Sequence, residues 1–409
     1  MRDTAERLGP SRASRDRQLG RERLAAALAL AIAAGGVALA ARAFLAGEAP
    51  PSVADAPGAP PTVAPPPPVR PTVAGRTVVG PFPNAAAVGE GGVWVSVPDS
   101  DGTTAGRIVR LDPRSGEAVA EIPVETTPTW ETGGGGLAAG GDSVWVMGSA
   151  DAPGGVNAPG GGTDALLLRL DPDANEVTER IVLGGVLGAD VVVGDGVIWA
   201  LIFSSTNELA VLSVDPATGE IQARIPVEGI WAQDLFWGEG AVWVNAAQPH
   251  PEFDSTVGAS TLTRIDPAAN AVSWTLPEAQ YVESVEDGDG LIWAVTHDGL
   301  ARIEADTGRL VDRLRGPDAK PTLLSHGGLT PFIVDEAGGA WLVGTRRDDW
   351  TIARLALATG EIDVEVSLGP GTKDNAWWIV DAALDPASPT LWIVHYRDHV
   401  SRIELHESQ

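Results

Sequence analysis

A tryptophan that recurs about every 50 residues is the feature that most constrains this sequence. The intervals between successive copies are 51, 54, 44, 50, 48 and 51 residues. Each copy follows a Gly-rich turn and lies in an apolar stretch: Trp94, Trp145, Trp199, Trp243, Trp293, Trp341 and Trp392. One aromatic residue per unit of about 40 to 50 residues is typical of four-stranded sheets repeated around an axis, the blades of a β-propeller. The sequence therefore predicts seven blades.

Within a unit, the turn residues divide the chain into four short antiparallel strands, which we name a to d from the axis outward. Gly-rich a–b turns such as Gly194-Asp195-Gly196 supply the positive φ angles of a tight hairpin. The c–d turns, such as residues 215–219 (Asp-Pro-Ala-Thr-Gly), combine a preset φ with an Asp that bonds its own backbone. Because each blade packs between two neighbours, strand b is apolar on both faces. We expect the repeated tryptophan to be buried between blades.

The last unit predicts how the ring closes. Residues 382–405 provide strands a, b and c, and the chain then ends without a fourth strand. The missing strand is predicted at residues 76–81, which resemble residues 364–370 of the sixth unit. Pairing this N-terminal strand with the last unit would cover the only open edge of the ring.

Three segments precede the predicted ring at 75–409. Residues 1–23 contain seven Arg against four acidic residues, and residues 24–41 form an uncharged run of 18 residues rich in Ala and Leu. Residues 47–74 contain ten prolines. This composition favours an extended, disordered stalk over a packed core.

The uncharged run predicts either a membrane anchor or a signal segment over residues 24–46. Its 18 residues approach the roughly 20 that span a bilayer, and the arginines before it favour a cytoplasmic N-terminus. The membrane is then a partner through one N-terminal hydrophobic helix, and the ring lies outside the cell. Ala41-Arg42-Ala43 also fits a signal-peptidase site, and cleavage after Ala43 would release a secreted protein.

Charge and composition limit the partners of the ring. The net charge of −27 disfavours nucleic acid as a partner. The absence of cysteine excludes disulfides and thiolate chemistry. The 26 Arg against 2 Lys suggest a GC-rich bacterial genome. We expect a monomer without a resident cofactor.

Loops at the channel mouth hold the candidate site residues. By analogy with other propellers, the d–a and b–c loops lie on one face, which usually carries the function. The predicted d–a segments concentrate aromatic residues and carboxylates, and we expect the following to bind a ligand: Trp130, Glu131, Trp231, Asp234, Tyr281, Glu283, Trp377, Trp378 and Asp381. The b–c loops at 148–163 and 246–260 are predicted to be long.

Three interpretations of this face remain open. The residues could simply cap the channel, or bind an unidentified protein, peptide, glycan or small molecule on aromatic platforms. They could also support catalysis, with His326 or His395 as a general base and a divalent metal whose identity and ligands the sequence does not specify. We favour a non-catalytic binding or sensing module, with a metal-dependent lyase or hydrolase as the alternative.

Two stretches resemble known propeller repeats. Residues 141–146 (Gly-Asp-Ser-Val-Trp-Val) and 212–221 (Leu-Ser-Val-Asp-Pro-Ala-Thr-Gly-Glu-Ile) are similar to repeats of YVTN-type surface proteins and of the streptogramin B lyase superfamily. The resemblance covers the predicted ring and implies a seven-bladed propeller. Lyases of that superfamily use His and Glu at the channel mouth with a metal, and their strand b typically carries Trp-Phe-Thr-Glu. Here the matching residues include Trp94-Val95-Ser96 and Trp243-Val244-Asn245, so the catalytic residues are not carried over.

Overall fold

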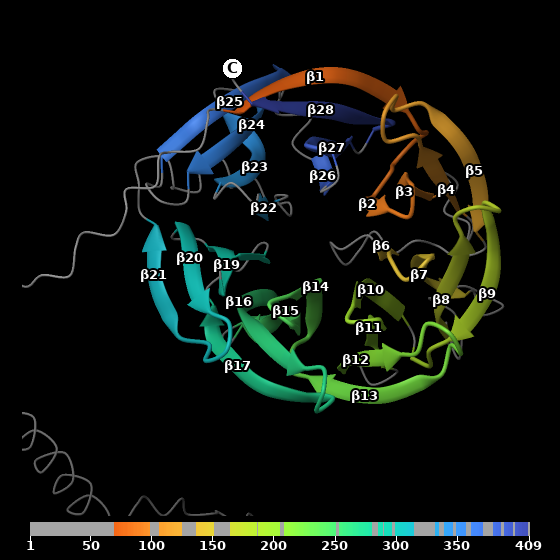
Figure 1. Ribbon diagram of the computed structural model, residues 1–409. Helices are drawn as coiled ribbons and strands as arrows, with labels where there is room; N and C mark the ends of the chain where they lie inside the picture. Colours follow the sequence, from red (N-terminus) through yellow and green to blue (C-terminus); the bar gives the residue numbers. More distant parts are fainter. Residues whose placement is uncertain are drawn as a thin grey trace, which may run out of the picture. The chain divides into compact units, whose positions relative to one another are not determined.

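Seven four-stranded antiparallel sheets surround a common axis in the computed structural model, which confirms the predicted seven-bladed β-propeller (Figure 1). The ring belongs to the unit Pro66–Gln409. The residues that the structure describes are 69–98, 106–124, 136–150, 164–185, 187–204, 208–250, 253–279, 285–288, 290–296, 299–314, 332–334, 339–346, 349–356, 361–370, 379–385, 388–395 and 397–407. The predicted N-terminal helix and most of the predicted stalk lie outside these residues.

The first four blades follow the chain in order, from the innermost strand outward. Blade 1 contains β2 (Ala85–Gly89), β3 (Gly92–Pro98), β4 (Gly106–Leu111) and β5 (Ala118–Val124). Blade 2 contains β6 (Leu137–Ala139), β7 (Val144–Ala150), β8 (Asp164–Asp171) and β9 (Glu176–Val182). Blade 3 contains β10 (Leu187–Gly194), β11 (Val197–Phe203), β12 (Leu209–Val214) and β13 (Ile221–Val227). Blade 4 contains β14 (Trp231–Gly238), β15 (Ala241–His250), β16 (Phe253–Asp266) and β17 (Ala271–Ala279).

The last three blades complete the ring, and only blade 7 takes a strand from elsewhere in the chain. Blade 5 contains β18 (Val285–Gly288), β19 (Leu291–Thr296), β20 (Gly299–Glu304) and β21 (Leu310–Leu314). Blade 6 contains β22 (Phe332–Val334), β23 (Gly339–Arg346), β24 (Asp349–Ala356) and β25 (Glu361–Pro370). Blade 7 contains β26 (Ile379–Asp385), β27 (Thr390–His395), β28 (His399–Glu407) and, on its outside, β1 (Val69–Val78).

Strand β1 closes the ring by pairing with the last strand of the chain. It runs antiparallel to β28 from Val69 opposite Glu407 to Val78 opposite His399. The strand begins six residues before residue 75, the predicted start of the ring, and ends before Val79. The amides of Val79 and Gly80 then donate to the carbonyl oxygen of Asp398, at 2.8 and 3.2 Å. The predicted closure by an N-terminal strand is therefore confirmed, with the strand shifted toward the N-terminus.

The repeated tryptophans form the contacts between blades. All seven are buried, with exposed fractions of 0 to 5 %. Trp94 of blade 1 packs in one apolar cluster with Leu137, Val144 and Leu168 of blade 2. Trp392 of blade 7 packs with Val93, Val95 and Val97 of blade 1. The same type of contact therefore also joins the last blade to the first. These contacts confirm the tryptophan as an inter-blade residue, where a large aromatic surface is most effective.

An arginine on strand c faces the tryptophan in six of the seven blades. Trp94 lies opposite Arg110 and Trp145 opposite Arg169 in the strand register. The guanidinium carbon lies 4.9 Å from the ring centroid of Trp94 in the first pair and 5.6 Å from that of Trp145 in the second. Equivalent arginines lie opposite the tryptophans of the other blades except blade 3: Arg264, Arg302, Arg354 and Arg402. Blade 3 has Ser213 in this place.

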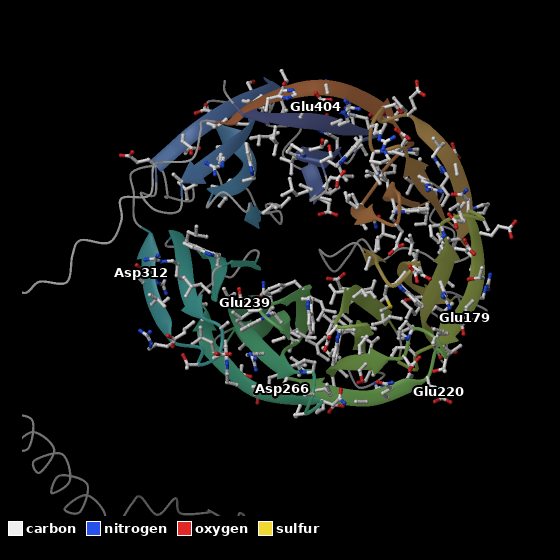
Figure 2. The ribbon with its side chains drawn as sticks, viewed as in Figure 1. Glu179, Glu220, Glu239, Asp266, Asp312 and Glu404 are labelled. Atoms are coloured by element: carbon white, nitrogen blue, oxygen red, sulfur yellow. The ribbon has the colours of Figure 1, made fainter. Side chains whose placement is uncertain are left out.

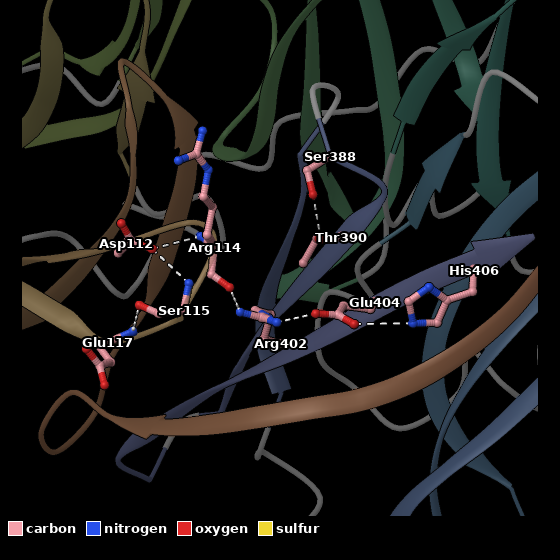
Figure 3. Close-up of polar contacts among 9 residues, drawn as sticks. All are labelled: Asp112, Arg114, Ser115, Glu117, Ser388, Thr390, Arg402, Glu404 and His406. Carbon is pink, nitrogen blue, oxygen red and sulfur yellow. Dashed lines mark hydrogen bonds and ion pairs between the residues drawn. The ribbon is translucent and has the colours of Figure 1, made fainter.

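At the junction of blades 7 and 1, this arginine reaches the next blade. Arg402 donates to the carbonyl oxygen of Arg114, in the c–d turn of blade 1, and also contacts Glu404 (Figure 3). That turn is held by Asp112, whose carboxylate accepts the amides of Arg114 and Ser115 at 2.9 and 2.7 Å. The predicted bonding of the turn aspartate to its own backbone is thus confirmed. These bonds hold the turn in place, and its Arg114 carbonyl oxygen accepts the hydrogen bond from Arg402.

One predicted loop is a hairpin in the structure. The segment 246–260 was expected to be a long b–c loop, but β15 and β16 continue through most of it. Their pairing extends to Pro249 opposite Val257 and His250 opposite Phe253, with irregular register on the way. The expectation of a loop was wrong because Pro and Gly within the segment mark bulges in paired strands. The other predicted long loop lies mostly outside the described residues.

Candidate functional site

The inner strands of blades 3, 4 and 7 each carry an aspartate at the same position near their first residues. Asp190, Asp234 and Asp381 all lie at a register irregularity with strand b. Each is two residues before the residue that pairs with the repeated tryptophan. Strand a is the innermost strand of every blade (Figure 1). These three positions therefore lie beside the channel, near the end where the d–a segments enter.

The carboxylate of Asp190 joins blade 3 to blade 4. One oxygen accepts the amide of Leu235 in β14 at 3.0 Å, and the other accepts the amide of Val191 at 2.8 Å. The side chain is buried, with 8 % of the residue exposed. Burial raises the pKa of Asp190 to about 7, although the amide hydrogen bonds lower it and the charge of Asp381 adds to the rise.

Asp381 makes the equivalent contact between blade 7 and blade 1. Its carboxylate accepts the amide of Ala86 in β2 at 2.7 Å and the amide of Ala382 at 2.8 Å. Burial raises the pKa of Asp381 to about 6, against the effect of the two amides. The predicted ligand-binding residue Asp381 therefore also connects two blades.

His395, the other predicted site residue with a described side chain, is buried where β27 meets β28. Its Nε2 shares a hydrogen bond of 2.8 Å with the hydroxyl of Ser401, and its ring stacks on His399 with centroids 4.1 Å apart. Burial lowers the pKa of His395 to about 3, and the charges of His399 and Arg76 lower it further. The imidazole is thus neutral and weakly basic, whereas a general base works best with a pKa near the operating pH.

The structure describes few of the predicted site residues. Trp231 and Asp234 lie in β14, at the channel end of blade 4, but their side chains are not described. The remaining candidates lie outside the described residues, so their grouping stays a prediction: Trp130, Glu131, Tyr281, Glu283, His326, Trp377 and Trp378. Of the predicted rim, only Asp381 and His395 have described side chains, and each is held by hydrogen bonds within the ring.

A cavity of about 460 Å³ lies at the opposite end of blades 1 and 2, among their a–b and c–d turns. It is lined by Arg110 and by carboxylates that include Glu90, Asp142 and Asp171. Glu90 adopts φ of 49° in the a–b turn, and its carboxylate accepts the amide of Asp142 in blade 2 at 3.2 Å. Arg110 donates to the carbonyl oxygen of Pro172 in the same region. The described groups of this cavity therefore connect neighbouring turns.

Acidic side chains are spread around the ring rather than gathered at one point. Figure 2 shows Glu404 at the top of the ring, Asp312 at the left and Glu179 and Glu220 at the lower right. Within the described ranges, no group of three or more His, Asp or Glu side chains is arranged to hold a metal ion. The described part of the chain also contains no helix long and apolar enough to cross a membrane.

No protein-family model fits this chain, and no curated protein matches it. The fold is nevertheless that of a seven-bladed β-propeller, since seven sheets of four antiparallel strands surround one axis.

The structural roles of two sets of residues were missed in the sequence although a signal was present. The inter-blade aspartates Asp190 and Asp381 both lie four residues before the end of strand a. Four of the six arginines opposite tryptophan lie two residues before an acidic residue at the c–d turn, as in Arg110-Leu111-Asp112 and Arg169-Leu170-Asp171. Both spacings recur along the sequence, but neither identifies the neighbouring blade as the partner.

Proposed function

We propose that this chain is a membrane-tethered propeller exposed outside the cell, acting as a non-catalytic binding or sensing module. Its ring would present the aromatic and acidic residues of the d–a segments to a protein, peptide, glycan or small molecule. We further propose that it belongs with the YVTN-type and streptogramin B lyase-like repeat proteins, on the basis of the repeats at residues 141–146 and 212–221.

The state of His395 carries the non-catalytic part of this proposal. A base at the channel mouth would need an accessible imidazole with a pKa near neutrality. His395 is 6 % exposed, bonded to Ser401 and stacked on His399, and its pKa is lowered to about 3. These features suit a side chain that holds β27 against β28. Recognition by the surrounding loops then explains the concentration of Trp and carboxylates better than proton transfer by His395.

The location rests on the segments before the ring. Seven arginines precede the 18-residue uncharged run, which favours a cytoplasmic N-terminus and an exported ring. The Pro-rich residues after this run would keep the ring at a distance from the membrane. Reporter fusions at the C-terminus test this, because an alkaline phosphatase fusion should be active and a cytoplasmic reporter inactive.

Binding is tested with the full chain on panels of glycans, peptides and small molecules. We expect a ligand to be retained intact, with or without EDTA, and its affinity to fall at least tenfold in Trp231→Ala. Val119→Ala, at a residue 57 % exposed on the outer strand β5, is the matched control and should bind normally. Turnover of the ligand that is lost with EDTA or in His395→Ala or His326→Ala would instead establish the lyase or hydrolase alternative.

A further inference from the structure

Strand β1, which closes the ring, begins directly after four consecutive prolines at residues 65–68. Its pairing with β28 is interrupted between Val73 and Gly75, where the register shifts. Such a β-bulge leaves a residue unpaired and disrupts the ladder locally. It divides β1 into a first segment, residues 69–73, and a second segment, residues 75–78, and the two are held in different ways.

The first segment lies on the outer surface of blade 7. Thr72 and Val73 are exposed, with 42 % of Val73 accessible to solvent. Pro71 stands opposite Leu405 in the ladder but has no amide hydrogen to donate. Gly75, just past the bulge, has open space beside it, since an added Cβ would meet no atom within 4 Å. A segment with exposed side chains and a missing donor opens more readily than a buried one.

The second segment is fastened to the neighbouring blades. The Arg76 guanidinium donates to the carbonyl oxygen of Leu368 in blade 6 at 2.9 Å. The Thr77 hydroxyl donates to the carbonyl oxygen of Gly116 in blade 1 at 2.5 Å. Val79, directly after the strand, is 4 % exposed and packs in the apolar cluster that joins blades 7 and 1. Detaching this segment would therefore break contacts to blades 6, 7 and 1 together.

We propose that β1 is a two-stage strap: under load the first segment peels from β28, while the second segment stays in place and keeps the ring closed. A pull on the Pro-rich segment reaches the ring at Val69, where β1 begins. Peeling stops at the bulge, because the contacts to three blades follow immediately. The strap adds a mechanical property to the proposed tethered propeller, and its use in the cell rests on that proposed function.

The direction of the ladder favours peeling. Val69 stands opposite Glu407, the last residue of β28. A pull on Val69 directed away from the ring therefore loads this end of the ladder, and the pairs break one after another rather than together. Release of residues 69–73 adds about 17 Å of extended chain, at about 3.4 Å per residue. The tether lengthens, while blade 7 keeps β26, β27, β28 and the second segment of β1.

Hydrogen exchange of the full chain in detergent tests the two stages without applied force. Amides of the first segment that face β28 should exchange at least about tenfold faster than those of residues 76–80, after correction for intrinsic rates. Arg76→Ala/Thr77→Val removes both side-chain fastenings and should bring the second segment close to the rate of the first. Thr72→Val is the matched control, because it makes the same change at an exposed position of the first segment and should leave the second segment protected. Equal protection on both sides of the bulge, or wild-type exchange in the double variant, would overturn the proposal.

Single-molecule pulling measures the strap directly. The chain has no cysteine, so Ala64→Cys in the Pro-rich segment and Val119→Cys on β5, at a residue 57 % exposed, provide two attachment points. A reversible extension of about 17 Å should appear at a lower force than unfolding of the ring. Unfolding in one step, without an earlier extension, would exclude the strap. The measurement involves no membrane, so reporter fusions that disproved the tether would leave its result unchanged.

Discussion

The junction between blades 1 and 2 and the junction between blades 3 and 4 bury the same repeated tryptophan in different surroundings. At the first, the indole of Trp94 donates to the carbonyl oxygen of Gly89 at 3.0 Å, and Arg110 lies over its ring. Arg110 also donates to Asn175 Oδ1 of blade 2 at 3.0 Å and to the carbonyl oxygen of Gly91 at 3.1 Å. The guanidinium of Arg110 thus links strand c of blade 1 to the a–b turn of its own blade and to blade 2.

At the second junction there is no arginine opposite the tryptophan. Trp199 faces Ser213, and neither the indole nitrogen nor the hydroxyl has a hydrogen-bond partner among the residues that the structure describes. Instead of an arginine, Trp237 of blade 4 packs on the cluster that contains Trp199. A Cβ atom added to Gly194 would clash with the Trp237 ring, which shows how closely this side chain covers the turn.

The difference shows that the junction between two blades can be packed in more than one way. A blade needs a large buried surface at each face, and the repeated tryptophan provides it in both cases. The remaining space is filled either by a guanidinium that satisfies carbonyl oxygens or by a second aromatic ring. The junction with the arginine gains charge-assisted hydrogen bonds. The junction with the second aromatic ring gains buried apolar area but leaves polar atoms without hydrogen-bond partners.

The largest effect should come from removing the shared tryptophan. Trp94→Ala and Trp199→Ala each delete a fully enclosed indole and should lower the free energy of unfolding by about 3–5 kcal/mol. Denaturant unfolding measures the loss. Trp199→Ala should be the milder of the two, since Trp237 can move into the space and the buried indole nitrogen without a partner is removed. An equal or larger loss in Trp199→Ala would show that Trp237 does not support this junction.

A methyl group placed under Trp237 should sharpen the comparison. Gly194→Ala forces the ring of Trp237 out of its position and should cost about 1–3 kcal/mol, the usual range for overpacking. Gly140→Ala is the matched variant in blade 2, where the added Cβ meets Val193 at 3.2 Å. It should cost clearly less. Similar losses in the two variants, measured by thermal unfolding, would contradict the close packing at the junction of blades 3 and 4.

The features that the sequence predicted are those that local spacing determines. Seven tryptophans define seven blades, and the Asp112 type of turn follows from a few adjacent residues. Partners in another blade are not determined locally. The arginine of Arg110-Leu111-Asp112 recurs along the chain, yet its acceptor at Asn175 depends on how two sheets pack. The sequence predicts Asp381 as a ligand-binding residue, but spacing does not reveal its contact with Ala86, 295 positions away.

The smallest of these effects concerns the guanidinium itself. Arg110→Leu keeps much of the apolar contact with Trp94 but loses the hydrogen bonds to Gly91, Pro172 and Asn175, and should cost about 1–2 kcal/mol. The reciprocal change, Ser213→Arg, should not stabilise the protein, because Trp237 already packs on the cluster that contains Trp199. Denaturant unfolding of both variants gives the change in the free energy of unfolding for each type of junction. If Ser213→Arg stabilises the protein, an arginine fits beside Trp237. An arginine and a second aromatic ring could then occupy the same junction, rather than replacing each other.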